Sequence, residues 1–167
     1  LVLGLGNDIL SDDAAGILVA RTLRAEHEAG MLVGPPDEAS VEVDIVDCAE
    51  SGISLLDRFA GHEKAIVIDS VVTGKVPPGT VHDIDPAELG PVLAPSPHYS
   101  GLPEMHALAR EMGVEFPREV KILGLEVQDP WTVGEQLSEP VRAALPGLEE
   151  RVRRQVREWA AAAGVGR

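Results

Sequence analysis

The sequence predicts an α/β fold: a three-layer sandwich in which a mixed, mostly parallel twisted sheet of about five strands is covered by helices on both faces. Two observations predict it. Short apolar runs rich in β-branched residues alternate along the chain with segments whose apolar residues recur every three or four positions. Strands and helices in alternation form such sheets, and right-handed crossovers bring the loops after the strands to one edge. The length of 167 residues fits a single domain over residues 1–167.

The first strand is predicted over residues 1–6, a short apolar run that ends in glycines. A helix is then expected to begin at about Asp12 or Asp13, because the side chains at positions 15, 18, 19, 22 and 23 fall on one helical face. Both carboxylates would lie at the positive end of the helix dipole.

The next segment is predicted to be a loop, a strand and a helix. The stretch Gly30–Ser40 is rich in Gly and Pro and is typical of a surface loop. Residues Val41–Asp47 alternate between apolar and polar, which predicts a strand with one wetter face. Ser51 is expected to cap a helix that runs to about Phe59.

A central strand is predicted over Ala65–Ile68, a continuous apolar run that delivers Asp69 to its carboxyl end. The turn at residues 77–79 leads to a short strand over Thr80–Ile84, which we expect to run antiparallel. If the first strand lies between the second and the third, Asp13 and Asp69 meet at one sheet edge. Ligands of such sheets bind at the carboxyl ends of the strands, where strand order reverses.

Beyond this strand, Gly90–Pro103 contains four prolines and two glycines and is expected to be an irregular loop that carries His98. The same patterns predict the remaining elements: a helix over residues 102–112 closed by Gly113, a last strand over Val120–Val127, a short helix from a Ser138 cap to Leu145, and a second helix from Pro146 to Gly164.

Composition excludes several classes of protein. There are 28 acidic and 14 basic residues, and a net charge of −14 repels phosphate backbones and anionic membranes, so we expect no nucleic-acid or membrane partner. No apolar run approaches the roughly 20 residues of a membrane span. Cys48 is the only cysteine, which rules out an intrachain disulfide. The chain also opens in a predicted strand rather than a secretory signal, so we expect a cytoplasmic protein.

Three side chains are candidates for chemistry. Asp69 ends a buried strand, where a carboxylate needs a partner or a ligand; the alternative is that it accepts hydrogen bonds from the turn that follows. Asp13, like Asp12, has an ordinary interpretation as a helix-end residue. His98 lies in a proline-rich loop, where a neutral imidazole can bind a metal. Two carboxylates and one imidazole suit a divalent ion such as nickel or zinc, with positions left for water or a partner's ligands.

Other interpretations are weaker. The remaining histidines lie in or beside predicted helices or in a strand and are assigned no role: His27, His62, His82 and His106. Gly4-Leu5-Gly6 begins like a dinucleotide-binding motif, but Ile9 stands at the third glycine position and nearby aspartates would face the pyrophosphate. No serine lies in a Gly-x-Ser-x-Gly elbow, which argues against a Ser-His-Asp hydrolase.

Four groups of residues, in order over nearly the whole chain, carry a family resemblance. They are Gly4-Leu5-Gly6-Asn7 with Ser11-Asp12-Asp13; Asp69-Ser70-Val71 with Gly74 and Pro78-Gly79; Ser96-Pro97-His98 with Gly101-Leu102 and Glu104; and Gly124-Leu125-Glu126 ahead of Leu137-Ser138. Through these blocks the sequence resembles the hydrogenase maturation endopeptidases.

The resemblance implies a mixed α/β sheet and an endopeptidase that removes the C-terminal extension from the precursor of the nickel-iron hydrogenase large subunit after nickel insertion. It also implies that Asp13, Asp69 and His98 contact the metal and form the catalytic site. Nickel would be shared with or supplied by the substrate, and other divalent ions would substitute for it. The ion would polarise the scissile carbonyl or lower the pKa of a bound water, with Asp13 or Asp69 as the base.

Two places depart from the pattern of that family. Ala14 stands where glycine is usual after the first acidic ligand. Residues 47–52 read Asp-Cys-Ala-Glu-Ser-Gly where the family tends to show Asp-x-Gly-Thr-x-Gly. These changes leave open the shape of that loop and its choice of large subunit, but neither replaces a proposed ligand.

Two other functions fit part of the pattern. A non-catalytic nickel-binding accessory or chaperone module of hydrogenase assembly would use the same three residues. A peptidyl-tRNA hydrolase also opens with a Gly-Leu-Gly-Asn strand exit, but it needs a basic face for tRNA, which the net charge of −14 disfavours.

Overall fold

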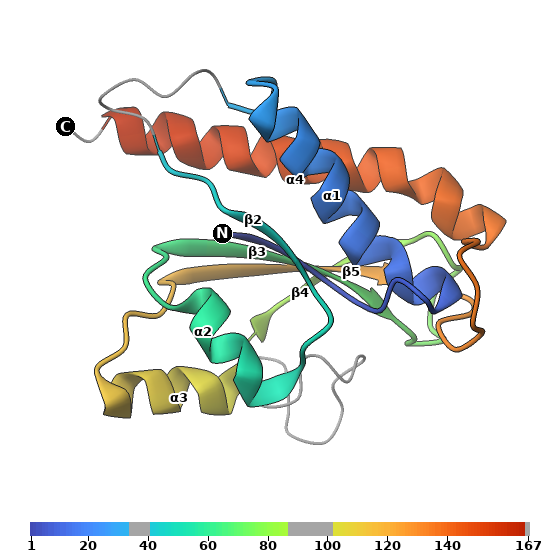
Figure 1. Cartoon of the computed structure of the whole chain (residues 1–167), viewed down its shortest axis with the longest axis horizontal. Helices are drawn as coiled ribbons and strands as arrows, with labels where there is room; N and C mark the ends of the chain where they lie inside the picture. Colours follow the sequence, from blue (N-terminus) through green and yellow to red (C-terminus); the bar gives the residue numbers. More distant parts are fainter. Residues whose placement is uncertain (34–40, 87–101, 166–167) are drawn as a thin grey trace.

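The computed structural model describes residues 1–33, 41–86 and 102–165. These residues form a five-stranded sheet with helices on both faces (Figure 1), which confirms the predicted α/β class. In chain order the elements are β1 (Val2–Leu5), the 3-10 helix η1 (Ser11–Ala14), α1 (Ala15–Glu28), β2 (Ile45–Cys48), the 3-10 helix η2 (Gly52–Leu55), α2 (Leu56–Phe59), β3 (Lys64–Val71), β4 (Val81–Ile84), α3 (Leu102–Met112), β5 (Glu119–Glu126) and α4 (Glu139–Val165).

The strand order in the sheet is β2-β1-β3-β5-β4. The strands β2, β1, β3 and β5 are parallel, and β4 pairs antiparallel with β5. Gly4 of β1 lies opposite Asp47 of β2 on one side and opposite Ile68 of β3 on the other. The predicted position of the first strand and the antiparallel fourth strand are therefore confirmed, and strand order reverses between β1 and β3.

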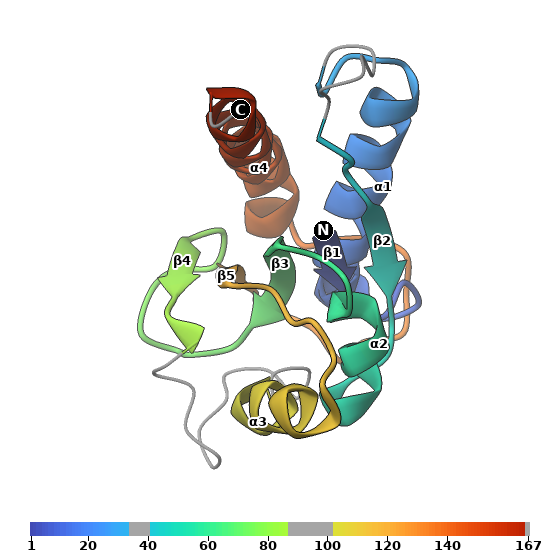
Figure 2. The same cartoon turned by 90° about the vertical axis from the view of Figure 1, so that its left-hand side faces the viewer.

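Helices α1 and α4 cover one face of the sheet, and α2 and α3 cover the other (Figures 1 and 2). The side chains of β3 alternate between these two layers. Ile66 and Ile68 belong to the core beneath α1 and α4, whereas Val67 and Val71 belong to the core beneath α2 and α3. This alternation explains why the strand reads as a continuous apolar run, since both of its faces are covered.

Two glycines bring the start of α1 into direct contact with the ends of β1 and β3. A Cβ atom on Gly16 would collide with the carbonyl oxygens of Leu5 and Ile68. Gly6 has a φ of +145°, and a Cβ atom there would collide with the carbonyl oxygen of Asp13. Both positions require glycine, and their close approach places η1 on the carboxyl edge of the sheet.

Replacing Gly16 with Ala is expected to lower the free energy of unfolding by about 1–3 kcal/mol or more, because the obstructing atoms are backbone and cannot move aside. Gly147, within α4, is the matched control because a Cβ atom there meets nothing within 4 Å. Gly147→Ala should stabilise the helix by about 0.5–1 kcal/mol. Urea unfolding of both variants measures the two changes, and equal stabilities would contradict the close contact at Gly16.

Three predicted elements differ from the structure. The second strand covers Ile45–Cys48 rather than Val41–Asp47, because β1 offers partners only from Val2, which pairs with Ile45. The strand β3 runs two residues beyond Asp69, to Val71. The predicted break at Pro146 is wrong: α4 is one continuous helix with this proline inside it.

The continuity of α4 has a packing explanation. A proline inside a helix costs about 3 kcal/mol through a lost hydrogen bond and a steric clash. Val141 before Pro146 and Leu148, Val152 and Val156 after it are all buried in the same core cluster. Because both parts pack on the same sheet face along one stripe, burial outweighs the local preference for a break.

Neither predicted serine cap uses its hydroxyl to cap a helix. Ser51 precedes η2 without a side-chain hydrogen bond to it, and Gly52 there has a φ of +61°. Ser138 does begin α4, because its carbonyl oxygen accepts from the amide of Arg142 at 2.9 Å. The Ser138 hydroxyl instead donates to Asp12 at 2.8 Å.

Candidate active site

The candidate site lies at the carboxyl edge of the sheet, beside the ends of β1 and β3. Asp13 comes from η1 and is half-buried. Asp69 comes from β3 and its residue is 0% exposed. The topology therefore brings the two predicted carboxylates to the same edge, as expected from the strand order.

Ser70 links these two carboxylates. Its hydroxyl donates to Oδ1 of Asp13 at 2.5 Å, and its backbone N–H donates to Oδ1 of Asp69 at 2.8 Å. Ser70 is itself buried, with 4% of its surface exposed. A short hydrogen bond to a carboxylate fixes the orientation of the acid. Ser70 was not among the residues predicted from the sequence, although its position directly after Asp69 could have identified it.

His98, the third predicted ligand, lies outside the described residues. Within residues 1–33, 41–86 and 102–165, no three side chains of the metal-binding types come together as a metal site. Of the three predicted ligands, the described part of the chain therefore contains the two carboxylates, Asp13 and Asp69.

Asp12 has a different function from its neighbour Asp13. Its residue is 0% exposed, and its carboxylate accepts four hydrogen bonds. The donors are the backbone amides of Gln128, Asp129 and Ser138, at 3.1, 2.9 and 2.6 Å, and the Ser138 hydroxyl at 2.8 Å. Asp12 therefore joins the turn that carries Asp13 to the β5–α4 loop and the start of α4.

Glu126, at the end of β5, holds a neighbouring loop in the same way. Its residue is 2% exposed. Its carboxylate accepts from the amides of Thr73 and Gly74, both at 2.8 Å, and from the Thr73 hydroxyl at 2.7 Å. The ring nitrogen Nε2 of His82 lies 2.9 Å from the same group. Glu126, like Asp69, is a carboxylate near the end of a buried strand. The same sequence signal could therefore have identified it, but Glu126 was assigned no role from that signal.

Burial by itself would raise the pKa of Glu126, but the hydrogen bonds from Thr73, Gly74 and His82 outweigh it and lower the pKa below its usual value. The charged form is thus favoured by folding. Its contribution to stability is present above the unfolded-state pKa and is lost as the pH falls through the folded-state pKa.

Glu126→Gln is therefore expected to lower the free energy of unfolding by about 1–3 kcal/mol at neutral pH, because amide donors of the 73–74 turn lose a charged acceptor. The difference from the wild-type protein should shrink between about pH 5 and pH 3, as Glu126 itself becomes protonated. Urea unfolding of both proteins across this pH range measures the difference in their free energies of unfolding. A difference that stays constant down to the acid end would contradict the lowered pKa.

The end of β2 is fixed to α1 by charge. Asp47 accepts from Nη1 of Arg24 at 2.6 Å and from Nε of Arg21 at 2.9 Å. Burial opposes ionisation of Asp47, but these two arginines outweigh it and lower its pKa. Asp47 and the left-handed Gly52, with φ +61°, are the two positions of the 47–52 loop that match the expected pattern, and both have a structural function.

Two of the described histidines and the cysteine have surroundings that do not favour a catalytic role. His106 is exposed on α3, with its ring centroid 5.4 Å from that of Phe116. His62 lies 2.9 Å from Asp44. Burial raises the pKa of the Cys48 thiol, so this cysteine stays protonated near neutral pH and is a poor nucleophile.

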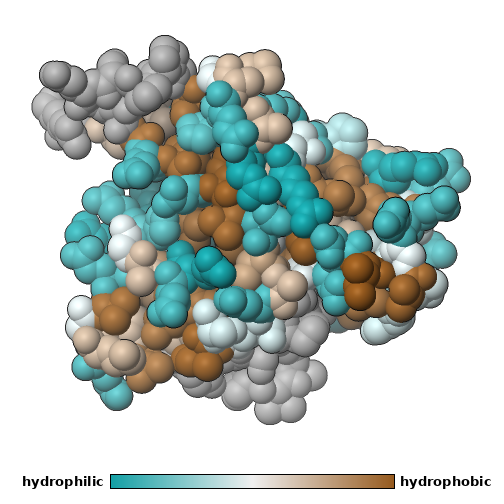
Figure 3. All heavy atoms as spheres, in the orientation of Figure 1, coloured by the Kyte–Doolittle hydropathy of each residue, from teal (hydrophilic) through white to brown (hydrophobic). Residues whose placement is uncertain are grey.

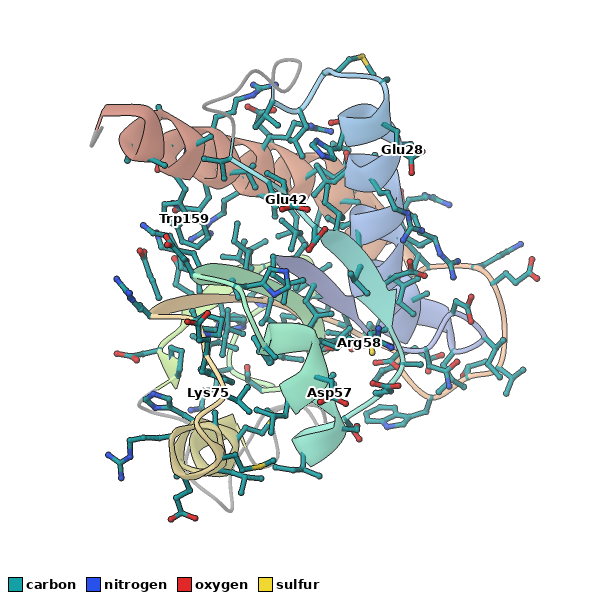
Figure 4. All side chains as sticks on the ribbon, turned by 60° about the vertical axis from the view of Figure 1, so that its left-hand side comes forward. Glu28, Glu42, Asp57, Arg58, Lys75 and Trp159 are labelled. Carbon is teal, nitrogen blue, oxygen red and sulfur yellow. The ribbon has the colours of Figure 1, made fainter. Side chains whose placement is uncertain are left out.

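A pocket of about 410 Å³ opens at the opposite edge of the sheet, beside the amino ends of β1 and β3. Glu42 and Trp159, both labelled in Figure 4, are among the residues that line it. Ligands of parallel sheets bind at the carboxyl edge instead. The candidate site is therefore assigned to Asp13 and Asp69 and not to this pocket.

None of the helices in the described ranges combines the length and the apolar composition that crossing a bilayer requires.

The sequence matches the hydrogenase maturation protease family over residues 25–155. It is 30% identical over 165 residues to the hydrogenase expression/formation protein HupD of Rhizobium leguminosarum bv. viciae, covering 97% of this chain and 76% of that protein. It is 31% identical over 127 residues to the hydrogenase 2 maturation protease of Escherichia coli (strain K12), covering 75% of this chain and 71% of that one.

The fold leads to the same group. The structure is similar to that of the hydrogenase maturating endopeptidase HybD from E. coli, with a TM-score of 0.71 and 27% identity over 94% of this chain and 91% of that chain. The family match covers most of the described sheet, and the predicted resemblance is confirmed. The chain therefore belongs to the hydrogenase maturation protease family and is a peptidase.

Proposed function

We propose that this peptidase removes the C-terminal extension from the precursor of a nickel-iron hydrogenase large subunit after nickel has been inserted. The observation that carries the proposal is the pair of carboxylates, Asp13 and Asp69, held by Ser70 at the carboxyl edge of the sheet. Membership of the hydrogenase maturation protease family suggests the class of substrate. The single cysteine fits a reducing compartment, and we infer that the protein acts in the cytoplasm.

The donor chemistry fits a divalent ion that arrives with the precursor. Ser70 occupies one oxygen of the Asp13 carboxylate, and within the described chain Oδ2 of Asp13 accepts no hydrogen bond. A carboxylate oriented through one oxygen keeps the other available as a ligand. Asp13, Asp69 and His98 would together hold the nickel of the substrate, and a carboxylate–imidazole set suits this ion.

The residues of this chain act by orientation and proton transfer. The Ser70 hydroxyl holds Asp13 in one rotamer, so that Oδ2 of Asp13 needs no further ordering when the substrate arrives. Asp13 or Asp69 accepts the proton of the attacking water and returns it to the leaving amine. Nickel, when bound, supplies positive charge that polarises a carbonyl oxygen or acidifies water.

This function is tested by incubating the protein with a large-subunit precursor prepared in nickel-loaded and nickel-free forms. We expect intact-mass spectrometry to show the loss of a C-terminal peptide from the loaded precursor alone. Binding of the loaded precursor without any shortening would instead indicate the non-catalytic accessory module. Equal cleavage of both forms would contradict recognition through the metal.

A further inference from the structure

An exposed apolar patch lies beside the candidate site. We call Ile9, Trp131 and Val133 the apolar patch; their residues are 59%, 69% and 76% exposed. The backbones that carry them meet directly, because Leu10 forms an antiparallel bridge with Val133 and the amide of Gly134 donates to the carbonyl oxygen of Ile9 at 3.0 Å. Figure 3 shows hydrophobic atoms grouped beside the start of α1 among hydrophilic ones. Exposed apolar groups of this kind mark interaction surfaces.

The loop that carries the patch is held rigidly. The Asp12 carboxylate accepts from the amides of Gln128, Asp129 and Ser138, which anchors both ends of the loop. Within the loop, Oδ1 of Asp129 accepts from the amides of Trp131 and Thr132 at 3.3 and 3.0 Å. A surface that is already ordered loses little conformational entropy on binding, and exposed tryptophan is typical of residues that dominate binding energy.

The two segments that carry the patch contain acidic but no basic side chains. Residues 127–141 contain no lysine or arginine and include the exposed carboxylates of Glu135 and Glu139. Residues 6–14 likewise contain no basic side chain, and the one basic contact of this segment is Arg21 of α1, which pairs with Asp8 at 2.9 Å among the described residues. An apolar patch bordered by negative charge is complementary to an apolar surface bordered by lysine or arginine.

We propose that the apolar patch is the docking surface for the metal-loaded precursor, which contacts it through an apolar surface flanked by basic side chains. This inference rests on the proposed function. The apolar patch and the candidate site are connected through one short segment. Asp13 lies four residues after Ile9, and Asp12 between them anchors the loop that carries Trp131. A precursor seated on the patch is therefore positioned relative to the two carboxylates.

The test uses the double variant Trp131→Ser/Val133→Ser with nickel-loaded precursor as the substrate. We expect KM to rise at least about 10-fold, with little change in kcat, because docking and not chemistry is impaired. The affinity of the free protein for Ni²⁺ should be unchanged. Met31→Ser is the matched control, since Met31 is 61% exposed and lies just beyond the far end of α1; this variant should leave KM unaltered.

The outcomes separate the two proposals. An unchanged KM in the double variant, or a fall in kcat alone, overturns the docking surface and leaves the peptidase function intact. Failure of the wild-type protein to cleave the precursor overturns both. A second variant, Glu135→Lys/Glu139→Lys, should also raise KM, and a lowered KM would contradict the basic flank on the partner.

Discussion

Asp69→Asn is expected to reduce precursor cleavage to less than about one hundredth of the wild-type rate while the protein remains folded. Asparagine keeps the shape of the side chain, and its Oδ1 still accepts from the Ser70 amide, so the local structure is preserved. It loses the negative charge that a metal ligand or a general base requires. Asp13→Asn should have the same effect, since its Oδ1 likewise still accepts from the Ser70 hydroxyl.

Cleavage followed by mass spectrometry, beside circular dichroism melts, measures this result. Asp57→Asn is the matched control because Asp57 is an exposed aspartate on α2 (Figure 4). This variant should cleave the precursor at the wild-type rate. Full cleavage by either the Asp13 or the Asp69 variant would remove that residue from the site. Loss of folding in parallel with activity would show a structural role instead.

The largest expected loss of stability follows Asp12→Ala, at about 3–5 kcal/mol. The substitution leaves three backbone amides and one hydroxyl without their buried acceptor. Stability of a domain is only about 5–15 kcal/mol in total, so the variant should unfold at markedly lower urea concentration.

Two companion variants set the scale for this effect. Ser138→Ala removes one hydroxyl donor and leaves the three amide bonds to Asp12, so it should cost only about 0.5–1.5 kcal/mol. Asp57→Ala, at an exposed position, should change stability by less than about 0.5 kcal/mol. If Asp12→Ala were no more destabilising than Ser138→Ala, the anchoring of the β5–α4 loop by Asp12 would be wrong.

Much of the frame of this site could be predicted from the sequence because periodicity and chain order determine it. The apolar run of β3 predicted a central strand, and the 2-1-3 strand order then placed Asp13 and Asp69 at one edge. Glycines at the end of β1 predicted a tight exit, and Gly6 and Gly16 make contacts that allow only glycine. These features depend on local pattern and on topology, both of which a single sequence carries.

Long-range polar contacts could not be predicted in the same way. Asp12 and Ser138 are 126 positions apart, and no periodicity connects a helix-end aspartate with the start of α4. The separate roles of Asp12 and Asp13 depend on which way each side chain points from a 3-10 turn. Pro146 illustrates the same limit, since burial on both sides of it overrides a local break signal.

The claim that Asp13, Asp69 and His98 hold one divalent ion together is tested most directly by calorimetric titration of Ni²⁺ into the free protein. The variants are Asp69→Asn, His98→Ala and their combination, with His106→Ala as the control because His106 is exposed on α3. We expect each single variant to lose at least about 10-fold in affinity, the double variant to lose less than the product of the two losses, and His106→Ala to bind normally. Normal binding by His98→Ala together with impaired binding by His106→Ala would contradict the site.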